Sequence, residues 1–316
     1  MKTLRMLLLT TVAASGAHAA MAEDGPKIVT SIKPLYSLTT ALTAGTPAET
    51  TLLVKGAASP HTYSMAPSEA RALQEADIVF WIGPSLEHFL EKPLEALGGN
   101  ADVVELEDVA GVETLSPREG GAFEPDDDED HDEEHGEHEG HHHGPVDPHM
   151  WLDPMNAKAF VSAMAETLAS EDPDNAAIYN ANAEKLDGAL DALTTDIKAR
   201  LADVSPKPYI VFHDAYHYFG DRFDVEAAGS VTVNPEAPPS AHRIQEIHDK
   251  LTELGAACVF SEPQFPPKVI DAIAEGTDTY VGTLDPIGAD LQDGPDLYFT
   301  LLNNLADGLV ECFEAQ

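Results

Sequence analysis

The chain has 316 residues, 43% of them hydrophobic, so it is long enough to bury one large core or two smaller ones. Its formal net charge of -39 at pH 7 makes it strongly acidic. Nucleic acids and anionic membrane surfaces would repel such a chain, and we therefore exclude both as partners.

Residues 1–22 have the features of a secretory signal peptide. Lys2 and Arg5 precede a short apolar stretch over 6–14, and small residues follow as a cleavage site. The stretch is too short to span a bilayer, which takes about 20 apolar residues. Because no cysteine lies near the cleavage site to carry a lipid, the sequence predicts a periplasmic protein that is not lipid-anchored.

Two further regions, 23–171 and 206–316, are predicted to form an N-terminal and a C-terminal lobe. In both, short apolar runs typical of buried strands alternate with helix-like stretches. This alternation indicates an α/β fold in which each lobe is a mainly parallel sheet flanked by helices. The predicted strands lie within 27–32, 51–54, 77–83, 102–106, 209–214, 257–262 and 280–285, and helices within 65–76, 240–254 and 266–275.

Residues 172–205 are predicted to form one long, rigid helix that joins the lobes. Asp172 is a suitable N-cap, and Pro173 suits the first helical position. At 1.5 Å per residue, a helix of about 30 residues spans roughly 45 Å, enough to cross a small domain. Two shorter helices broken near Gly188 are the alternative. Apolar residues recur three or four apart along this segment, at Tyr179, Ala183, Leu186, Leu190, Leu193, Ile197 and Leu201.

The N-terminal lobe also contains an acidic, histidine-rich insertion over 124–143. It has no apolar periodicity and is predicted to be a mobile loop, because it cannot bury enough surface to offset the entropy of ordering it. Its histidines are candidate low-affinity metal ligands, since each binding event must order the chain. We expect the loop to capture or buffer metal, and the alternative is a solvating acidic linker. The six are His131, His135, His138, His141, His142 and His143.

The chain has two cysteines, Cys258 and Cys312. In an oxidising compartment an even pair indicates a disulfide. Such a bridge would close about 55 residues and contribute on the order of 4 kcal/mol by the chain-entropy argument. Two separate buried thiols are the alternative.

Four metal-capable side chains outside the loop lie where a strand or a short turn ends. They are His61 in "SPHTY", His149 in "DPHMWLDP", His213 in "FHDAYHYF" and Asp285 in "TLDPIG". Open α/β sheets gather ligand groups at such connections. Because two come from each lobe, an ion bound by all four would lie between the lobes. Taken singly, each histidine has a hydrogen-bonded structural role as its alternative.

Six stretches, in this order, closely resemble the periplasmic zinc-binding proteins of high-affinity zinc ABC uptake systems, the metal-binding cluster A-I family. The resemblance covers nearly the whole mature chain and implies two α/β lobes joined by one long helix, with the metal at their interface. The stretches are "GAASPHTYSMAPSEARALQEADIVFWIGPSLE", "DPHMWLDP", "VFHDAYHYFGDRF", "VTVNPEAPPSAHRIQEI", "CVFSEPQFPPKVI" and "VGTLDPIG".

The resemblance places the family's metal histidines at His61, His149 and His213, and its frequent carboxylate ligand at Asp285. Some zinc binders carry a glutamate just before the first histidine, where this chain has Pro60. The fourth position is therefore expected to fall to Asp285 or to water.

Two further acids are expected to orient a ligating imidazole by a hydrogen bond. Glu236, in "NPEAPPS", matches a family acid near the cleft, and Asp214 follows His213 directly.

A site of three imidazoles favours Zn²⁺ over the manganese of related carriers, which resemble two histidines with two carboxylates. The resemblance implies a monomeric, non-enzymatic carrier that delivers Zn²⁺ to the membrane permease of an ABC transporter, with a periplasmic zinc chaperone as a further candidate partner. The alternatives are a zinc hydrolase using the same three histidines, a manganese carrier of the same fold, and a zinc buffer or adhesin without a transporter.

Overall fold

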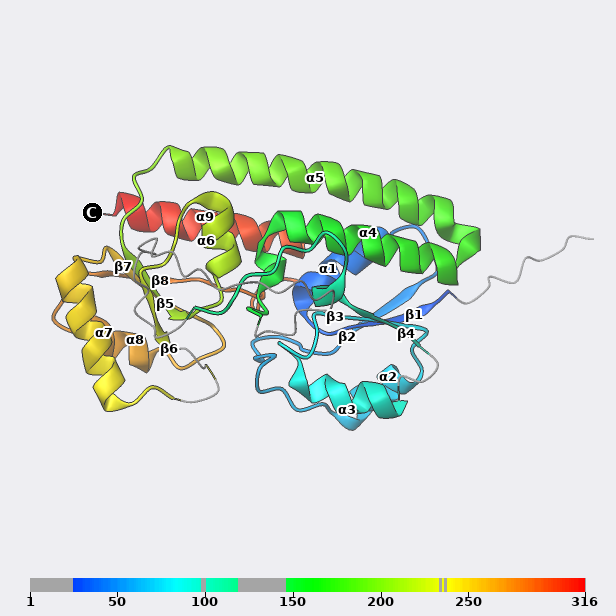
Figure 1. Cartoon of the computed structure of the whole chain (residues 1–316), viewed down its shortest axis with the longest axis horizontal. Coiled ribbons are helices and arrows are strands. Elements are labelled where there is room, and N and C mark those ends of the chain that lie inside the picture. Colours follow the sequence, from blue (N-terminus) through cyan, green and yellow to red (C-terminus); the bar gives the residue numbers. More distant parts are fainter. Residues whose placement is uncertain (1–24, 98–100, 119–145, 233–234, 236–237, 316) are drawn as a thin grey trace, which may run out of the picture.

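The computed structural model describes residues 25–97, 101–118, 146–232, 235 and 238–315, and these form two α/β lobes bridged by long helices (Figure 1). Each lobe is built on a four-stranded sheet whose strands are all parallel. The predicted fold class is thereby confirmed. Among the described helices, none is both long and apolar enough to cross a membrane.

The N-terminal sheet has the strand order β2-β1-β3-β4, with helices on both faces. Alternate side chains of one strand enter two cores: Ile78 and Phe80 join the core under α1 and α4, whereas Val79 and Trp81 join the core under α2 and α3. Both faces of the central strand β3 are buried, which is why it is continuously apolar. The elements are β1 (Lys27–Thr30), α1 (Lys33–Leu42), β2 (Glu49–Leu52), α2 (Pro67–Gln74), β3 (Ile78–Trp81), α3 (His88–Leu97), β4 (Asp102–Glu105) and the 3₁₀ turn η1 (Leu106–Asp108).

The C-terminal sheet repeats this arrangement, with the order β6-β5-β7-β8. Ile210 and Phe212 of the central strand face the core under α7 and α8, while Tyr209 and Val211 face the large core that both lobes share. The elements are β5 (Tyr209–His213), α6 (His217–Phe223), β6 (Gly229–Thr232), α7 (Ala241–Leu254), β7 (Cys258–Ser261), α8 (Lys268–Ala274), β8 (Tyr280–Thr283) and α9 (Leu297–Glu314).

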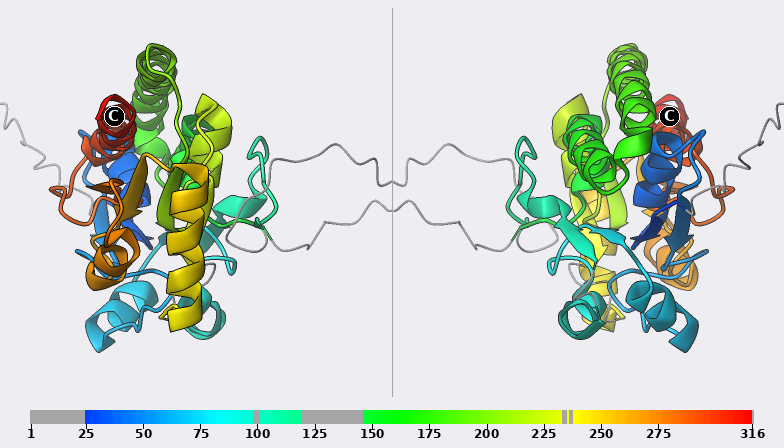
Figure 2. Two further views of the ribbon diagram at one scale, coloured as in Figure 1. Left: turned by 90° about the vertical axis from the view of Figure 1, so that its left-hand side faces the viewer. Right: turned by 90° about the vertical axis from the view of Figure 1, so that its right-hand side faces the viewer.

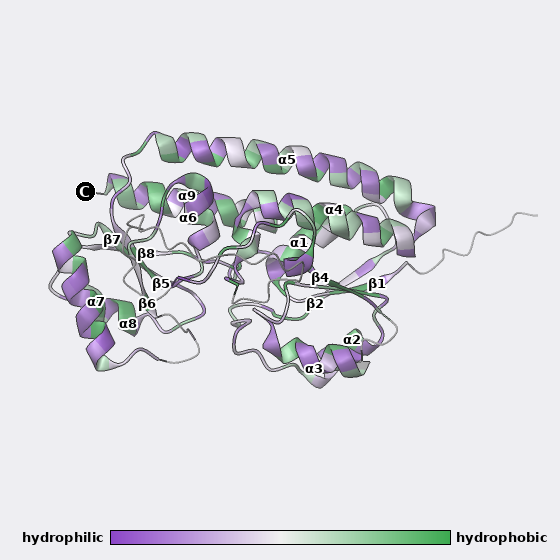
Figure 3. Cartoon of the chain, in the orientation of Figure 1, coloured by the Kyte–Doolittle hydropathy of each residue, from purple (hydrophilic) through white to green (hydrophobic). Residues whose placement is uncertain are grey.

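The helix α5 (Ala176–Ala202) runs along both lobes as one unbroken element of 27 residues. It passes through Gly188 without interruption, so the alternative of two short helices is wrong. Its apolar residues recur at helical spacing (Figure 3) and are buried against α4 (Pro154–Glu171), α9 and α1. The linking helix predicted from the sequence is therefore present.

The start of this helix differs from the expectation. Residues Pro173–Asn175 form a separate 3₁₀ turn, η3, and α5 begins after it. The Asp172 carboxylate does not cap α5 and instead accepts hydrogen bonds from Asn175 Nδ2 at 2.8 Å and Tyr179 OH at 2.7 Å. The physical reason is the sharp reversal between α4 and α5, which a 3₁₀ turn makes in fewer residues than a capped α-helix.

The C-terminal helix α9 provides a second bridge between the lobes, which the sequence analysis did not predict. It packs beside α5 and contacts both α1 and β8 (Figure 2). The segment just before it is held on the N-terminal lobe by buried Lys33, whose Nζ donates to the carbonyls of Ala289 at 3.1 Å and Leu291 at 2.8 Å. The chain therefore returns to the first lobe before it ends in the second.

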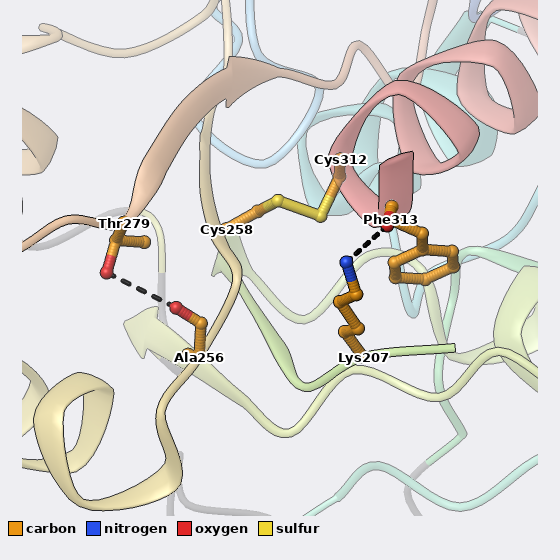
Figure 4. Close-up of a disulfide and its surroundings, with 6 residues drawn as sticks. All are labelled: Lys207, Ala256, Cys258, Thr279, Cys312 and Phe313. Atoms are coloured by element: carbon orange, nitrogen blue, oxygen red, sulfur yellow. Dashed lines mark hydrogen bonds between the residues drawn. A yellow bond between two sulfur atoms is a disulfide. The ribbon is translucent and has the colours of Figure 1, made fainter. Parts of the chain in front are cut away.

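A disulfide joins Cys258 at the start of β7 to Cys312 in α9, with their Cα atoms 6.0 Å apart (Figure 4). This is the pair expected from the sequence. Because α9 contacts both lobes, the bridge attaches the second sheet covalently to the helix that ties the lobes together.

Candidate metal centre

Three histidines from distant parts of the chain meet in the cleft between the lobes. His61 lies in the loop between β2 and α2, His149 directly precedes the 3₁₀ turn η2 (Met150–Leu152), and His213 is the last residue of β5. His61 and His213 lie at the carboxyl ends of β2 and β5, where parallel sheets collect ligand groups.

The His61 loop is held in place by its neighbour Tyr63. The Tyr63 hydroxyl donates to the carbonyl of Leu53 at 3.1 Å and to the carboxylate of Glu69 at 2.8 Å. Glu69 also accepts from the backbone N–H of Ala66 at 2.7 Å. The loop is thereby fixed to the end of β2 and to the first turn of α2, which directs the imidazole towards the cleft.

The ring nitrogens of the three histidines converge. His149 Nε2 lies 3.2 Å from His61 Nε2 and 3.3 Å from His213 Nε2, and the ligand nitrogens all lie within 4.8 Å of one another. Imidazoles around a tetrahedral zinc ion, with Zn–N near 2.0–2.1 Å, place their nitrogens about 3.3 Å apart. The spacing of the Nε2 atoms therefore fits one shared ion.

Two buried carboxylates fix the orientation of two of these rings. Asp147 Oδ1 accepts from His149 Nδ1 at 2.7 Å and from the His149 backbone N–H at 3.0 Å. Glu262, directly after β7, accepts through Oε1 from His213 Nδ1 at 2.8 Å and from the His213 backbone N–H at 3.2 Å. Each Nδ1 is thus the protonated nitrogen, which leaves the Nε2 lone pair for a metal.

The environment keeps the first histidine neutral. Burial, reinforced by the nearby His149 and His213 rings, lowers the pKa of His61 from 6.5 to about 2. Burial works to raise the pKa of Asp147, but contact with His149 outweighs it and holds that carboxyl well below its usual range. A neutral imidazole and an ionised carboxylate are the forms that a histidine metal site needs.

The cavity beside the histidines is small and mostly apolar. Its volume of about 10 Å³ is close to the minimum that holds one water molecule. The space beside the histidines therefore suits a single ion and its ligands. The lining residues are Ser59, Pro60, His61, His149, Trp151, His213, Gln264, Phe265, Pro286 and Ile287.

Two arginine–aspartate pairs cross the cleft in opposite directions. Arg118 of the N-terminal lobe donates from Nε to Asp214 of the C-terminal lobe at 2.9 Å. Arg222 of α6 donates to both oxygens of Asp153, at 2.8 Å and 2.6 Å, and Asp153 is the N-cap of α4. Bidentate pairs of this kind fix geometry as well as adding energy, so the lobes are held together on this side of the site.

Asp285, expected as a carboxylate ligand, does not join the three histidines. Its Oδ1 accepts from Gln264 Nε2 at 2.9 Å and from the backbone N–H groups of Ile287 at 3.3 Å and Gly288 at 3.0 Å. The carboxylate therefore closes the turn after β8. The metal-capable group formed by the described residues comprises the histidines alone.

One of the two acids expected to orient an imidazole has another partner. Asp214, which directly follows the end of β5, pairs with Arg118. Glu236 and the six histidines of the 124–143 insertion lie outside the described residues, as does the predicted signal peptide.

The orienting carboxylates Asp147 and Glu262 were missed in the sequence analysis. A signal existed for both. Asp147 stands two residues before His149, and Glu262 follows an apolar strand just as His213 ends one. Since strands β5 and β7 are neighbours in the sheet, their ends lie side by side.

The fold and the convergent histidines together define a two-lobed α/β metal-binding protein with its site between the lobes. A family model, described as the periplasmic component A of the zinc-uptake complex (ZnuA), matches residues 28–312. The chain belongs to this family, as its sequence motifs indicated.

Individual relatives agree with this membership. The chain is 47% identical to the high-affinity zinc uptake system protein ZnuA of Brucella abortus (strain 2308), over 99% of each chain. It is 37% identical to the ZnuA of Paracoccus denitrificans (strain Pd 1222), over 98% of each. A crystal structure of ZnuA superposes with a TM-score of 0.76 at 26% identity, covering 92% of this chain and 100% of its own.

Proposed function

We propose that this protein captures Zn²⁺ in the periplasm and delivers it to the membrane permease of an ABC transporter. The observation that carries the proposal is the meeting of the His61, His149 and His213 Nε2 atoms beside a small cavity with space for about one water molecule. Relatives that the chain matches over nearly its full length are zinc uptake proteins.

The mechanism is binding without chemistry. Neutral imidazoles donate three nitrogens to the ion, and the ionised Asp147 and Glu262 behind them strengthen those donors and offset the ion's charge. The acidic chain attracts cations towards the cleft. The loaded protein then docks on the permease, and transport is driven by the ATPase of the same system.

The competing functions fit the site less well. A hydrolase needs room for a substrate beside the metal-bound water, and the cavity beside the histidines has space for about one water molecule. A manganese carrier is disfavoured by a cluster of three imidazoles, since manganese prefers oxygen ligands.

Zinc binding by wild-type protein and by His149→Gln protein, in competition with a chelator, tests the proposal. We expect the wild type to bind one ion tightly and the variant to lose more than about 100-fold in affinity, beyond the loss typical of an outer partner. His88→Gln is the matched control, because His88 has a 68% exposed side chain that pairs with Glu91 three residues further along α3. Equal tight binding by all three proteins would refute the assignment.

A growth assay separates a carrier from a zinc buffer or adhesin. Cells that lack the protein should starve in zinc-poor medium and recover with the wild type but not with His149→Gln. Normal growth without the protein would leave buffering or adhesion as its function.

We further propose that the 124–143 insertion captures zinc weakly and passes it to the cleft. Its six imidazoles lie among eleven carboxylates counted between 124 and 139, a composition that binds ions with fast exchange. Deletion of 124–143 should lower the total zinc bound and slow transfer from a chelator, while one tight ion remains. Unchanged stoichiometry and transfer would show that the insertion only solvates the chain.

A further inference from the structure

We propose that Gln264 supplies the fourth donor atom to the ion, through its side-chain carbonyl oxygen Oε1. This inference rests on the proposed function, because it takes the three histidines as the metal site. It assigns the fourth ligand position, which the sequence analysis left to Asp285 or to water, to the side-chain amide of Gln264.

Gln264 comes from the loop after β7 and lines the same small cavity as the three histidines. It follows Glu262 by two residues, so the segment that orients His213 also carries this amide. A chain segment fixed at Glu262 by three short contacts to His213 has little freedom nearby. The placement of Gln264 beside the site is therefore determined by the site's own architecture.

The orientation of the amide is chemically determined. Its Nε2 donates to Asp285 Oδ1 at 2.9 Å, and an ionised carboxylate can only accept, so the nitrogen must be the end that faces Asp285. Asp285 is itself fixed by the backbone N–H groups of Ile287 and Gly288. Asp285 therefore acts as a positioning residue that turns the oxygen of Gln264 away from itself.

The carbonyl oxygen that results is buried and has no hydrogen-bond partner within the described residues. Leaving such a group unsatisfied costs about 1–3 kcal/mol, so this oxygen calls for a partner beyond the described residues. A metal ion bound by the three adjacent imidazoles is such a partner. Zinc takes four ligands, and three nitrogens leave one position open.

The charge of the cluster also favours a neutral fourth ligand. Three neutral imidazoles contribute no charge, and the buried carboxylates of Asp147 and Glu262 together offset the two positive charges of the ion. The Gln264 amide completes the coordination without adding charge.

A protein ligand in the fourth position has a functional consequence. It excludes water and small anions from the ion, so the site does not generate the metal-bound hydroxide that hydrolytic zinc enzymes use. It also belongs to the C-terminal lobe, as does His213, so each lobe contributes two donors. Separation of the lobes then removes two ligands at once, which suits release.

The test uses the full chain with one equivalent of Co²⁺, whose visible spectrum reports coordination, and azide as a probe of an exchangeable position. The spectrum of His149→Gln is subtracted to remove cobalt bound elsewhere. We expect the wild-type spectrum to be unaffected by azide, whereas Gln264→Leu responds to azide and releases Zn²⁺ at least about tenfold faster. Gln264→Glu, which keeps an oxygen, should remain insensitive to azide, and Gln245→Leu on the exposed face of α7 is the surface control.

Two outcomes would overturn the inference. If azide shifts the wild-type spectrum as it shifts that of Gln264→Leu, an exchangeable water holds the fourth position. If azide affects neither protein but affects Asp285→Ala, the ligand is Asp285. In both cases cobalt still binds through the histidines, whereas a wild type that gives no histidine-dependent cobalt spectrum would instead refute the proposed function.

Discussion

Replacing Glu262 by glutamine is expected to weaken zinc binding by about 10- to 100-fold, or about 1.4–2.7 kcal/mol. The magnitude follows from what Glu262 does. It is 3% exposed and its two oxygens lie 2.7 Å and 2.8 Å from His213 Nδ1. An amide of the same shape has no charge to raise the basicity of the ring, and it presents an N–H group where an acceptor is needed.

The assay is a chelator competition that yields Kd, combined with stopped-flow measurement of zinc release. Glu262→Gln should release zinc faster and keep a stoichiometry of one tight ion, because the three imidazoles remain. Glu246→Gln is the matched control, since Glu246 is half-exposed and pairs with Arg243 one helical turn away. A folded Glu262→Gln protein whose Kd lies within twofold of the wild type would refute the idea that this carboxylate tunes the site.

Three further outcomes follow from the structure. Burial lowers the pKa of His61 to about 2 in the folded protein, whereas the ring titrates near 6.5 in the unfolded chain. Between these two pH values only the unfolded state binds the proton. The metal-free protein should therefore lose up to about 1.4 kcal/mol of stability per pH unit below pH 6.5. Chemical denaturation should show a shallower loss for His61→Gln, and parallel curves would contradict the assignment. Arg222→Met, which removes hydrogen bonds to the buried Asp153, should cost about 1–3 kcal/mol and speed zinc release, whereas unchanged release would mean that the pair does not hold the lobes. Replacing Cys258 and Cys312 by alanine should lower the unfolding free energy by on the order of 4 kcal/mol by the chain-entropy argument, and an unchanged denaturation midpoint would contradict it.

The central strands could be predicted from short, continuous apolar runs in the sequence. Runs such as "IVFW" at 78–81 and "YIVFH" at 209–213 are buried throughout, because both faces of a parallel sheet are covered by helices. His213, at the end of the second run, could be predicted as a ligand because ligand groups gather at strand ends. Periodicity likewise predicted α5, whose core residues face α4 and α9.

Other features depend on contacts that a single sequence does not specify. The helix α9 was not among the predicted elements, and a single sequence does not specify that its start would contact α1 across the lobes. Asp285 is equally suited to bind metal or to close a turn. Here the backbone turns at Gly288, which has a φ of +73°, and its N–H group donates to the Asp285 carboxylate. The pairing of Asp147 and Glu262 with the rings required knowing which strand ends are neighbours.

X-ray absorption at the zinc edge, on full-length protein carrying one equivalent of Zn²⁺, tests most directly whether the three histidines share one ion. Three imidazole nitrogens at about 2.0–2.1 Å with one oxygen are expected, and the imidazole signal should fall in His149→Gln. A spectrum dominated by carboxylate oxygens, or one that His149→Gln leaves unchanged, would place the ion elsewhere and contradict the assignment of the cleft as the zinc site.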